Sequence, residues 1–194
     1  MAYAIVVIGA STGGLRALQV LLSGLPEDFP LPVVIVQHRG KDTEIGLCEF
    51  LGRSCRLPVT EPEDKDGLLG GHVYLAPRDY HLLVENGSIS LSTEPPVGFA
   101  RPSIDVLFET AAEEYKERAI GVILTGANRD GVRGLAGIQS QGGVTVVEDP
   151  VSAACRELPE AALGLIKPDW VLPLRDIPSC LQRLSNSKTE YHGI

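Results

Sequence analysis

Long apolar runs are missing from this sequence. No run approaches the ~20 residues that a membrane-spanning helix needs, so we expect no membrane insertion. The N-terminus lacks a basic region followed by a cleavage site, and nothing in it suggests export. Cationic residues are also in deficit, with 17 Lys and Arg against 25 Asp and Glu and a formal net charge of −8. Because phosphate-binding surfaces are basic, this balance argues against nucleic acid as a partner.

Cysteine is scarce as well. The four cysteines form no C-x-x-C pair and do not cluster with histidines, which argues against a zinc site or a dithiol redox motif. We interpret them as buried free thiols in a reducing, cytoplasmic setting. They are Cys48, Cys55, Cys155 and Cys180.

What the sequence does contain is typical of one well-cored globular domain. It has 194 residues, of which 44% are hydrophobic and 22% charged. Apolar strand-like runs alternate with helical patterns. Strands are predicted at 3–8, 33–37, 58–60, 73–77, 119–124, 144–148 and 171–172. Helices are predicted at 15–22, from Asp42 or Thr43 through Leu51, from Pro102 through Ala111, up to Gln141, at 159–165 and at 177–184.

This alternation predicts the fold class. We expect a three-layer α/β/α fold with a doubly wound, mostly parallel sheet covered on both faces. Asn86-Gly87 separates two strand-like runs and suits a type I′ turn, so an antiparallel hairpin is expected at 81–92. Residues 1–185 are predicted to form the domain, and residues 186–194 a frayed C-terminal tail.

Three of the predicted strands end in a polar residue beside glycine. These residues are Ser11, His38 and Asp130. Because the carboxyl ends of parallel strands meet at one edge of a sheet, where ligands bind, we expect the three side chains to lie together. A serine hydroxyl needs an imidazole to take its proton, and a buried carboxylate orients that imidazole. The pattern therefore favours nucleophilic acyl transfer.

The other histidines fit this site less well. His72 precedes its strand and belongs at the opposite edge of the sheet, His81 lies in the hairpin, and His192 lies in the tail. His38 is consequently the candidate base.

The turn around Ser11 has a sequence that several functions could use. A strand, a glycine-rich turn and a helix start can cradle a phosphate or present a nucleophile beside an oxyanion hole. Residues 9–13 match the G-x-S-x-G nucleophile elbow, but the order serine, histidine, acid differs from that of α/β-hydrolases, and only ten residues precede Ser11. A dinucleotide-binding G-x-G-x-x-G would need glycine at Ser11. A packing turn in which Ser11 merely caps the helix is the remaining structural alternative.

With these residues in hand, the chain resembles the catalytic domain of the chemotaxis receptor methylesterases, the CheB family. The similarity extends to about Leu184 and is carried by motifs at 8–14, 36–38, 73–77, 101–108 and 124–131. The resemblance implies hydrolysis of γ-glutamyl methyl esters on the cytoplasmic helices of methylated chemoreceptors, with deamidation of glutamine as a further activity. It assigns Ser11 as nucleophile, His38 as base and Asp130 as the orienting acid. It also implies that no metal and no organic cofactor is used.

The oxyanion donors are predicted from the turn itself. Backbone N–H groups at the start of the helix after Gly13, together with one near Ala127, would hold the oxyanion. Thr12 is either a secondary donor or a helix-capping hydroxyl.

Two departures from the family pattern affect the expectation. Members usually carry an N-terminal receiver domain, whereas this chain starts at the first catalytic strand, so we expect no receiver domain in it. Either the chain is a fragment, or the protein works without that domain and is regulated otherwise, for which a separate regulatory protein is one option. Members usually have Met-Gly-Asn where this chain has Ala127-Asn128-Arg129. The smaller Ala127 is expected to open the pocket wall, and Arg129 adds charge beside Asp130.

Five arginines fall at loops or helix starts near the predicted site. On an acidic protein they suggest a local basic rim that steers an acidic receptor helix, solvated surface arginines being the alternative. They are Arg16, Arg39, Arg78, Arg101 and Arg129. Besides the receptor methylesterase, two hypotheses stay open, namely an esterase acting on another protein or a small ester, and a binding module without activity.

Overall fold

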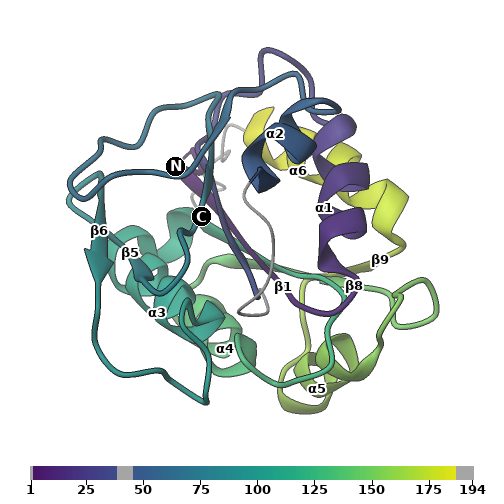
Figure 1. Ribbon diagram of the computed structural model, residues 1–194. Coiled ribbons are helices and arrows are strands. Elements are labelled where there is room, and N and C mark those ends of the chain that lie inside the picture. Colours follow the sequence, from purple (N-terminus) through teal and green to yellow (C-terminus); the bar gives the residue numbers. More distant parts are fainter. Residues whose placement is uncertain (1, 39–45, 187–194) are drawn as a thin grey trace, which may run out of the picture.

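A parallel sheet forms the centre of the molecule (Figure 1). The computed structural model describes residues 2–38 and 46–186, and in these residues the sheet has seven parallel strands. Their spatial order is β3 (Val59–Thr60), β4 (Val73–Leu75), β2 (Val33–Gln37), β1 (Ile5–Ala10), β7 (Ala119–Ile123), β8 (Val144–Glu148) and β9 (Trp170–Leu172).

Helices cover both faces of the sheet. One face carries α1 (Gly14–Ser23), α2 (Leu47–Gly52) and α6 (Ile177–Asn186). The other carries α3 (Ile104–Tyr115), α4 (Val132–Ser140) and α5 (Glu157–Leu165). Short 3₁₀ turns, η1 (Lys116–Arg118) and η2 (Leu174–Asp176), precede β7 and α6. The predicted three-layer α/β/α class is therefore confirmed.

The central strands form where the sequence is apolar without alternation. Every residue of β1, β2 and β7 is buried, because helices cover both sides of the sheet. Burying a Val or Ile side chain contributes about 1.5–3 kcal/mol each, so these three strands stabilise the middle of the sheet most strongly.

The predicted hairpin is confirmed. Strands β5 (His81–Glu85) and β6 (Ser88–Ser92) pair antiparallel and pack against α3. Asn86 and Gly87 both have positive φ, 51° and 72°, as a type I′ turn requires.

Strand order reverses at β1, and this reversal positions the site. After β1 the chain builds the sheet outward through β2 on one side and later through β7 on the other. The parallel register pairs Ala10 with Gln37, so Ser11 and His38 follow at the same level. The His38 N–H donates to the Ala10 carbonyl at 3.0 Å, and the Ser11 N–H donates to the Thr125 carbonyl at 3.0 Å.

Some details differ from the sequence-based expectation. β1 runs from Ile5 to Ala10 rather than from 3 to 8, and α5 begins at Glu157. The proposed helix caps Asp42 and Thr43 lie outside the described residues. Among the described residues none of the four cysteines forms a disulfide, but only Cys180 is buried, so the prediction of buried thiols was wrong for the other three. In the described part of the chain, no helix is long and apolar enough to span a bilayer.

Candidate active site

Ser11 lies in the tight turn between β1 and α1, at the carboxyl edge of the sheet. Gly9 has no room for a Cβ because Ile104 of α3 packs against it, and Gly13 has a φ of 79°. The turn closes with the Gly14 N–H donating to the Ser11 carbonyl at 2.8 Å. Ser11 is 9% exposed, so its hydroxyl is sheltered and still reachable.

His38 bridges Ser11 and Asp130. Its Nδ1 faces the Ser11 Oγ at 3.3 Å, and its Nε2 lies 2.7 Å from the Asp130 Oδ2. The Nε2–H donates to the carboxylate, which leaves Nδ1 with a lone pair directed toward the serine side. The three residues at the predicted strand ends are thus brought together in one chain of contacts.

Asp130 is held by the N-terminus of α3. The Ser103 hydroxyl donates to its Oδ1 at 2.7 Å, and the N–H groups of Ile104 and Asp105 donate at 2.7 and 3.1 Å. Burial pushes the pKa of Asp130 upward, but the bonds from His38, Ile104, Ser103 and Asp105 outweigh it and hold the pKa below its usual range. Asp130 is therefore a carboxylate at neutral pH and favours a proton on His38 Nε2.

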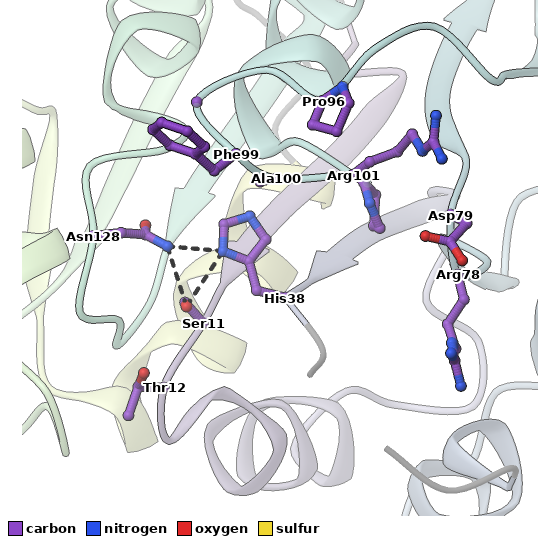
Figure 2. A pocket seen from close by; sticks show the side chains of 12 residues that line it. Ser11, Thr12, His38, Arg78, Asp79, Pro96, Phe99, Ala100, Arg101 and Asn128 are labelled. Carbon is purple, nitrogen blue, oxygen red and sulfur yellow. Dashed lines mark hydrogen bonds between the residues drawn. The ribbon is translucent and has the colours of Figure 1, made fainter. Parts of the chain in front are cut away.

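Asn128 also reaches the site, which sequence reasoning missed. Its Oδ1 accepts the Asp130 N–H at 3.2 Å, and its Nδ2 lies 2.8 Å from His38 Nδ1 and 3.4 Å from the Ser11 Oγ (Figure 2). Asparagine commonly bonds its own backbone two residues on, so its place two residues before Asp130 is the signal that could have found it.

Gln37 ties the two strand ends together. Its side-chain N–H groups donate to the Ser11 carbonyl at 2.9 Å and to the His38 carbonyl at 2.7 Å. Gln37 is 6% exposed, so these bonds are well shielded from water and fix the backbone on which both reactive side chains stand.

A cavity of about 640 Å³ opens over Ser11 and His38. Its wall opposite the sheet comes from the loop before α3, including Pro96, Phe99 and Arg101 (Figure 2). The volume suits a side chain presented by another molecule.

The predicted oxyanion residues line three different hollows. Thr12 lines it, and its carbonyl accepts the Thr125 hydroxyl at 2.9 Å. Gly13 lines a shallow hollow on the α1 side of Ser11. Ala127 is exposed and lines a groove formed with α4 and α5.

The predicted arginine rim is only partly assembled at this cavity. Arg78 and Arg101 line it, and Arg101 donates to the carbonyls of Thr93 and Glu94 at 2.9 and 3.1 Å. Arg16 and Arg129 line the two neighbouring hollows, and Arg39 lies outside the described residues.

The remaining histidines have other surroundings, as expected. His81 is buried, and its ring accepts the Ser103 N–H at Nδ1 and donates from Nε2 to the Pro95 carbonyl. His72 stacks on Tyr74, and His192 lies outside the described residues. Within residues 2–38 and 46–186, no group of three or more His, Cys, Asp or Glu side chains could hold a metal ion.

This arrangement can activate a hydroxyl. A sheltered serine faces an imidazole lone pair, and a carboxylate receives the opposite ring N–H. Such a set can move the serine proton to the ring and stabilise the imidazolium that results.

Comparisons with known proteins find similar sequences over most of this chain. A family model described as CheB methylesterase matches residues 6–181. A provisionally named protein-glutamate methylesterase/protein-glutamine glutaminase of Leptospira interrogans is 44% identical over 191 residues, covering 98% of this chain and 99% of that protein. Protein-glutamate methylesterase/protein-glutamine glutaminase 2 of Anaeromyxobacter dehalogenans is 44% identical over 181 residues, covering 93% of this chain and 53% of that protein.

A solved structure is also similar. The crystal structure of the Thermotoga maritima CheB methylesterase catalytic domain matches with a TM-score of 0.89 and 36% identity, covering 95% of this chain and 100% of that one. Fold and sequence therefore agree over nearly the whole length of the chain.

Proposed function

The chain belongs to the CheB methylesterase family, and from that premise we propose that it hydrolyses glutamyl methyl esters on chemotaxis receptors and deamidates receptor glutamines. The observation that carries the proposal is the contact series Ser11–His38–Asp130 beneath an open cavity. It supplies the nucleophile, base and orienting acid that ester hydrolysis needs.

The proposed reaction has two steps. Ser11 Oγ attacks the ester carbonyl while its proton passes to His38 Nδ1, and that proton then leaves with the methoxy group as methanol. Water, deprotonated at the same nitrogen, hydrolyses the glutamyl-serine ester and frees a carboxylate and the serine hydroxyl. Asp130, ionised because of its lowered pKa, stabilises the transient imidazolium in both steps. With a glutamine side chain the leaving group is ammonia.

The oxyanion would be held by backbone N–H groups of Thr12, Gly13 and Ala127. The first two precede α1, where the helix dipole favours negative charge. One such donor is typically worth about 3–4 kcal/mol of barrier. A cytoplasmic location is part of the same proposal, because the receptor helices that serve as substrate are cytoplasmic. A separate regulatory protein is proposed as a further partner.

Methanol release from methylated receptor tests the proposal. The wild type is expected to release methanol, and Ser11→Ala to lose activity by at least about 10³-fold, because within residues 2–38 and 46–186 no other hydroxyl contacts His38. Ser23→Ala is a matched control, since that exposed hydroxyl at the end of α1 bonds only its own helix. Absence of release by the wild type would remove the proposed function, and release surviving in Ser11→Ala would remove the role of Ser11.

A further inference from the structure

The Asn128 side-chain amide occupies the ring nitrogen of His38 that faces Ser11. We propose that Asn128 is a positioning residue, which holds the Nδ1 lone pair in the free protein and yields it to Ser11 when a substrate fills the cavity. The proposal rests on the roles given to Ser11 and His38 above.

The orientation of the amide is set by its neighbours. The Asn128 Oδ1 accepts the Asp130 N–H at 3.2 Å, so the NH₂ group is the end that faces His38. The ring is oriented as well, because its Nε2–H donates to Asp130 and leaves Nδ1 as an acceptor. The 2.8 Å contact is therefore an N–H of Asn128 donating to the lone pair of Nδ1.

Two donors compete for that single lone pair. The amide lies 2.8 Å from Nδ1, whereas the Ser11 hydroxyl lies 3.3 Å away, longer than a typical O–H hydrogen bond. Once Nδ1 takes the serine proton it becomes a donor and can no longer accept from Asn128. The hydrogen bond from the Asn128 side chain to His38 Nδ1 must therefore break in every turnover.

The Asn128 side-chain NH₂ group has a second acceptor within reach. Its Nδ2 already lies 3.4 Å from the Ser11 Oγ and lines the cavity, so a small rotation directs it toward an incoming carbonyl (Figure 2). Holding the lone pair in the absence of substrate makes Ser11 less reactive toward small electrophiles. The cost of breaking one hydrogen bond corresponds to about three- to tenfold in rate.

The test is the rate at which a fluorophosphonate phosphonylates the Ser11 hydroxyl with loss of fluoride. Asn128→Ala is expected to react about three- to tenfold faster than the wild type. Asn128→Ser is the folding control, because its hydroxyl can still accept the Asp130 N–H but is too short to reach His38, and it should react faster as well. The ¹⁵N shift of Nδ1 in the NMR spectrum should move to that of a free imidazole nitrogen in both variants. Unchanged or slower phosphonylation in both variants, or an unchanged Nδ1 shift, would overturn the proposal.

A second feature carries an independent inference. Phe99 is 103% exposed, fully presented to solvent at the wall of the Ser11 cavity (Figure 2). It occupies a two-residue turn in which Val97 and Ala100 exchange N–H···O bonds of 3.1 and 2.9 Å. Gly98 and Phe99 have φ of 56° and 68°.

The turn at Gly98 and Phe99 does not favour the stability of the folded chain. A bulky side chain in the left-handed region is strained, and an exposed aromatic ring gains nothing from burial. Yet the loop is fixed, because Arg101 donates to the carbonyls of Thr93 and Glu94, and His81 donates to that of Pro95. A strained, rigidly presented aromatic side chain beside a reactive hydroxyl fits a binding contact.

We infer that Phe99 is the apolar anchor for the receptor helix that carries the methylated glutamate, an inference that rests on the proposed function. Residues three and four apart on a helix lie about 5–6 Å from each other. A helix whose esterified side chain enters the cavity would therefore set an apolar residue one turn away against Phe99.

The test compares two substrates. Phe99→Ser is expected to lower kcat/KM for methylated receptor by about 10- to 100-fold through KM, since a fully buried Phe is worth that much. Hydrolysis of p-nitrophenyl acetate, which is too small to reach the anchor, should fall by a much smaller factor than hydrolysis of methylated receptor. Val151→Ser is the matched control, because Val151 is 94% exposed and does not line the cavity.

Equal losses on both substrates, or no loss on the receptor, would overturn the anchor role. If the wild type hydrolyses p-nitrophenyl acetate but releases no methanol from receptor, the proposed function falls and the anchor role falls with it.

Discussion

Two buried aspartates, Asp130 and Asp105, support each other's helices and differ in what else they bind. Asp130 precedes α4 and accepts from the N-terminus of α3. Asp105 lies in the first turn of α3 and accepts the N–H groups of Gly131 and Gly134, at 2.9 and 2.8 Å, from the N-terminus of α4. Each carboxylate thus satisfies donors that would otherwise be unpaired at the neighbouring helix end.

The remaining partner separates their roles. Asp130 receives the ring N–H of His38, whereas Asp105 receives the guanidinium of Arg133, whose side chain is 67% exposed. Both aspartate side chains are only 7% exposed, so burial does not distinguish them. The same crossed capping therefore yields one carboxylate available to the site and one that serves packing alone.

The largest difference between the two aspartates is expected in catalysis, when Asp130 is neutralised. In Asp130→Asn the ring loses its acceptor for Nε2–H and can turn to the tautomer that places the proton on Nδ1, so Ser11 loses its base. We expect kcat for ester hydrolysis to fall by about 10³- to 10⁴-fold. Asp105→Asn, measured in parallel under conditions where the protein stays folded, should lose less than about tenfold. Comparable losses in the two variants would contradict the division of roles.

The next effect is a loss of stability when Asp105 is removed. Asp105→Ala leaves the N–H groups of Gly131 and Gly134 buried without acceptors. We expect the free energy of unfolding to fall by about 2–4 kcal/mol, measured by urea denaturation. Arg133→Ala is the control and should change it by less than about 1 kcal/mol, since the pair is screened on the arginine side. A large effect of Arg133→Ala would mean that the ion pair, not the capping, carries the stability.

The smallest effect concerns a third buried carboxylate, Glu148. It is 1% exposed and accepts one backbone N–H, from Thr125 at 2.9 Å. Burial raises the pKa of Glu148, and the negative charge of Asp149 raises it further. The hydrogen bond from the Thr125 N–H only partly offsets these two effects. Because the pKa of Glu148 is raised in the folded state, the protein loses stability as pH rises through that pKa. Asp130 has the opposite effect, since its lowered pKa stabilises the folded protein at pH values above the pKa of the carboxyl group in the unfolded chain.

Glu148→Gln keeps an acceptor for Thr125 and removes the charge. Relative to wild type, its free energy of unfolding should rise as the pH increases from about 4 to about 7. Denaturant titrations across that range measure the difference. A difference that falls with pH would show that the carboxylate is better solvated than its single hydrogen bond implies.

Much of the fold was predictable because burial on both faces leaves a simple pattern. Strands β2 and β8 and the hairpin were predicted to the residue, since apolar runs and an Asn-Gly turn specify them locally. The end of β1 was missed, because Gly9 and Ala10 have weak strand propensity and stay extended only through packing against α3 and β2.

The site was predictable to the extent that topology determines it. Parallel strands bring Ser11, His38 and Asp130 to one edge whatever the side chains do. The crossed capping by Ser103 and Asp105, and the reach of Asn128, depend on how two helices and a turn pack, which periodicity does not encode. The placement of Ala127 in a neighbouring groove has the same origin.

The wide spacing of the site residues along the chain links the site to the order of folding. Ser11 is 27 residues from His38, and His38 is 92 residues from Asp130. Contacts at such separations form late in folding, because the entropic cost of closing the loop comes before the contacts can stabilise the structure. Reactivity of Ser11 during refolding would therefore follow the docking of β7 and α3 onto β1, and would rise after helical signal has already recovered.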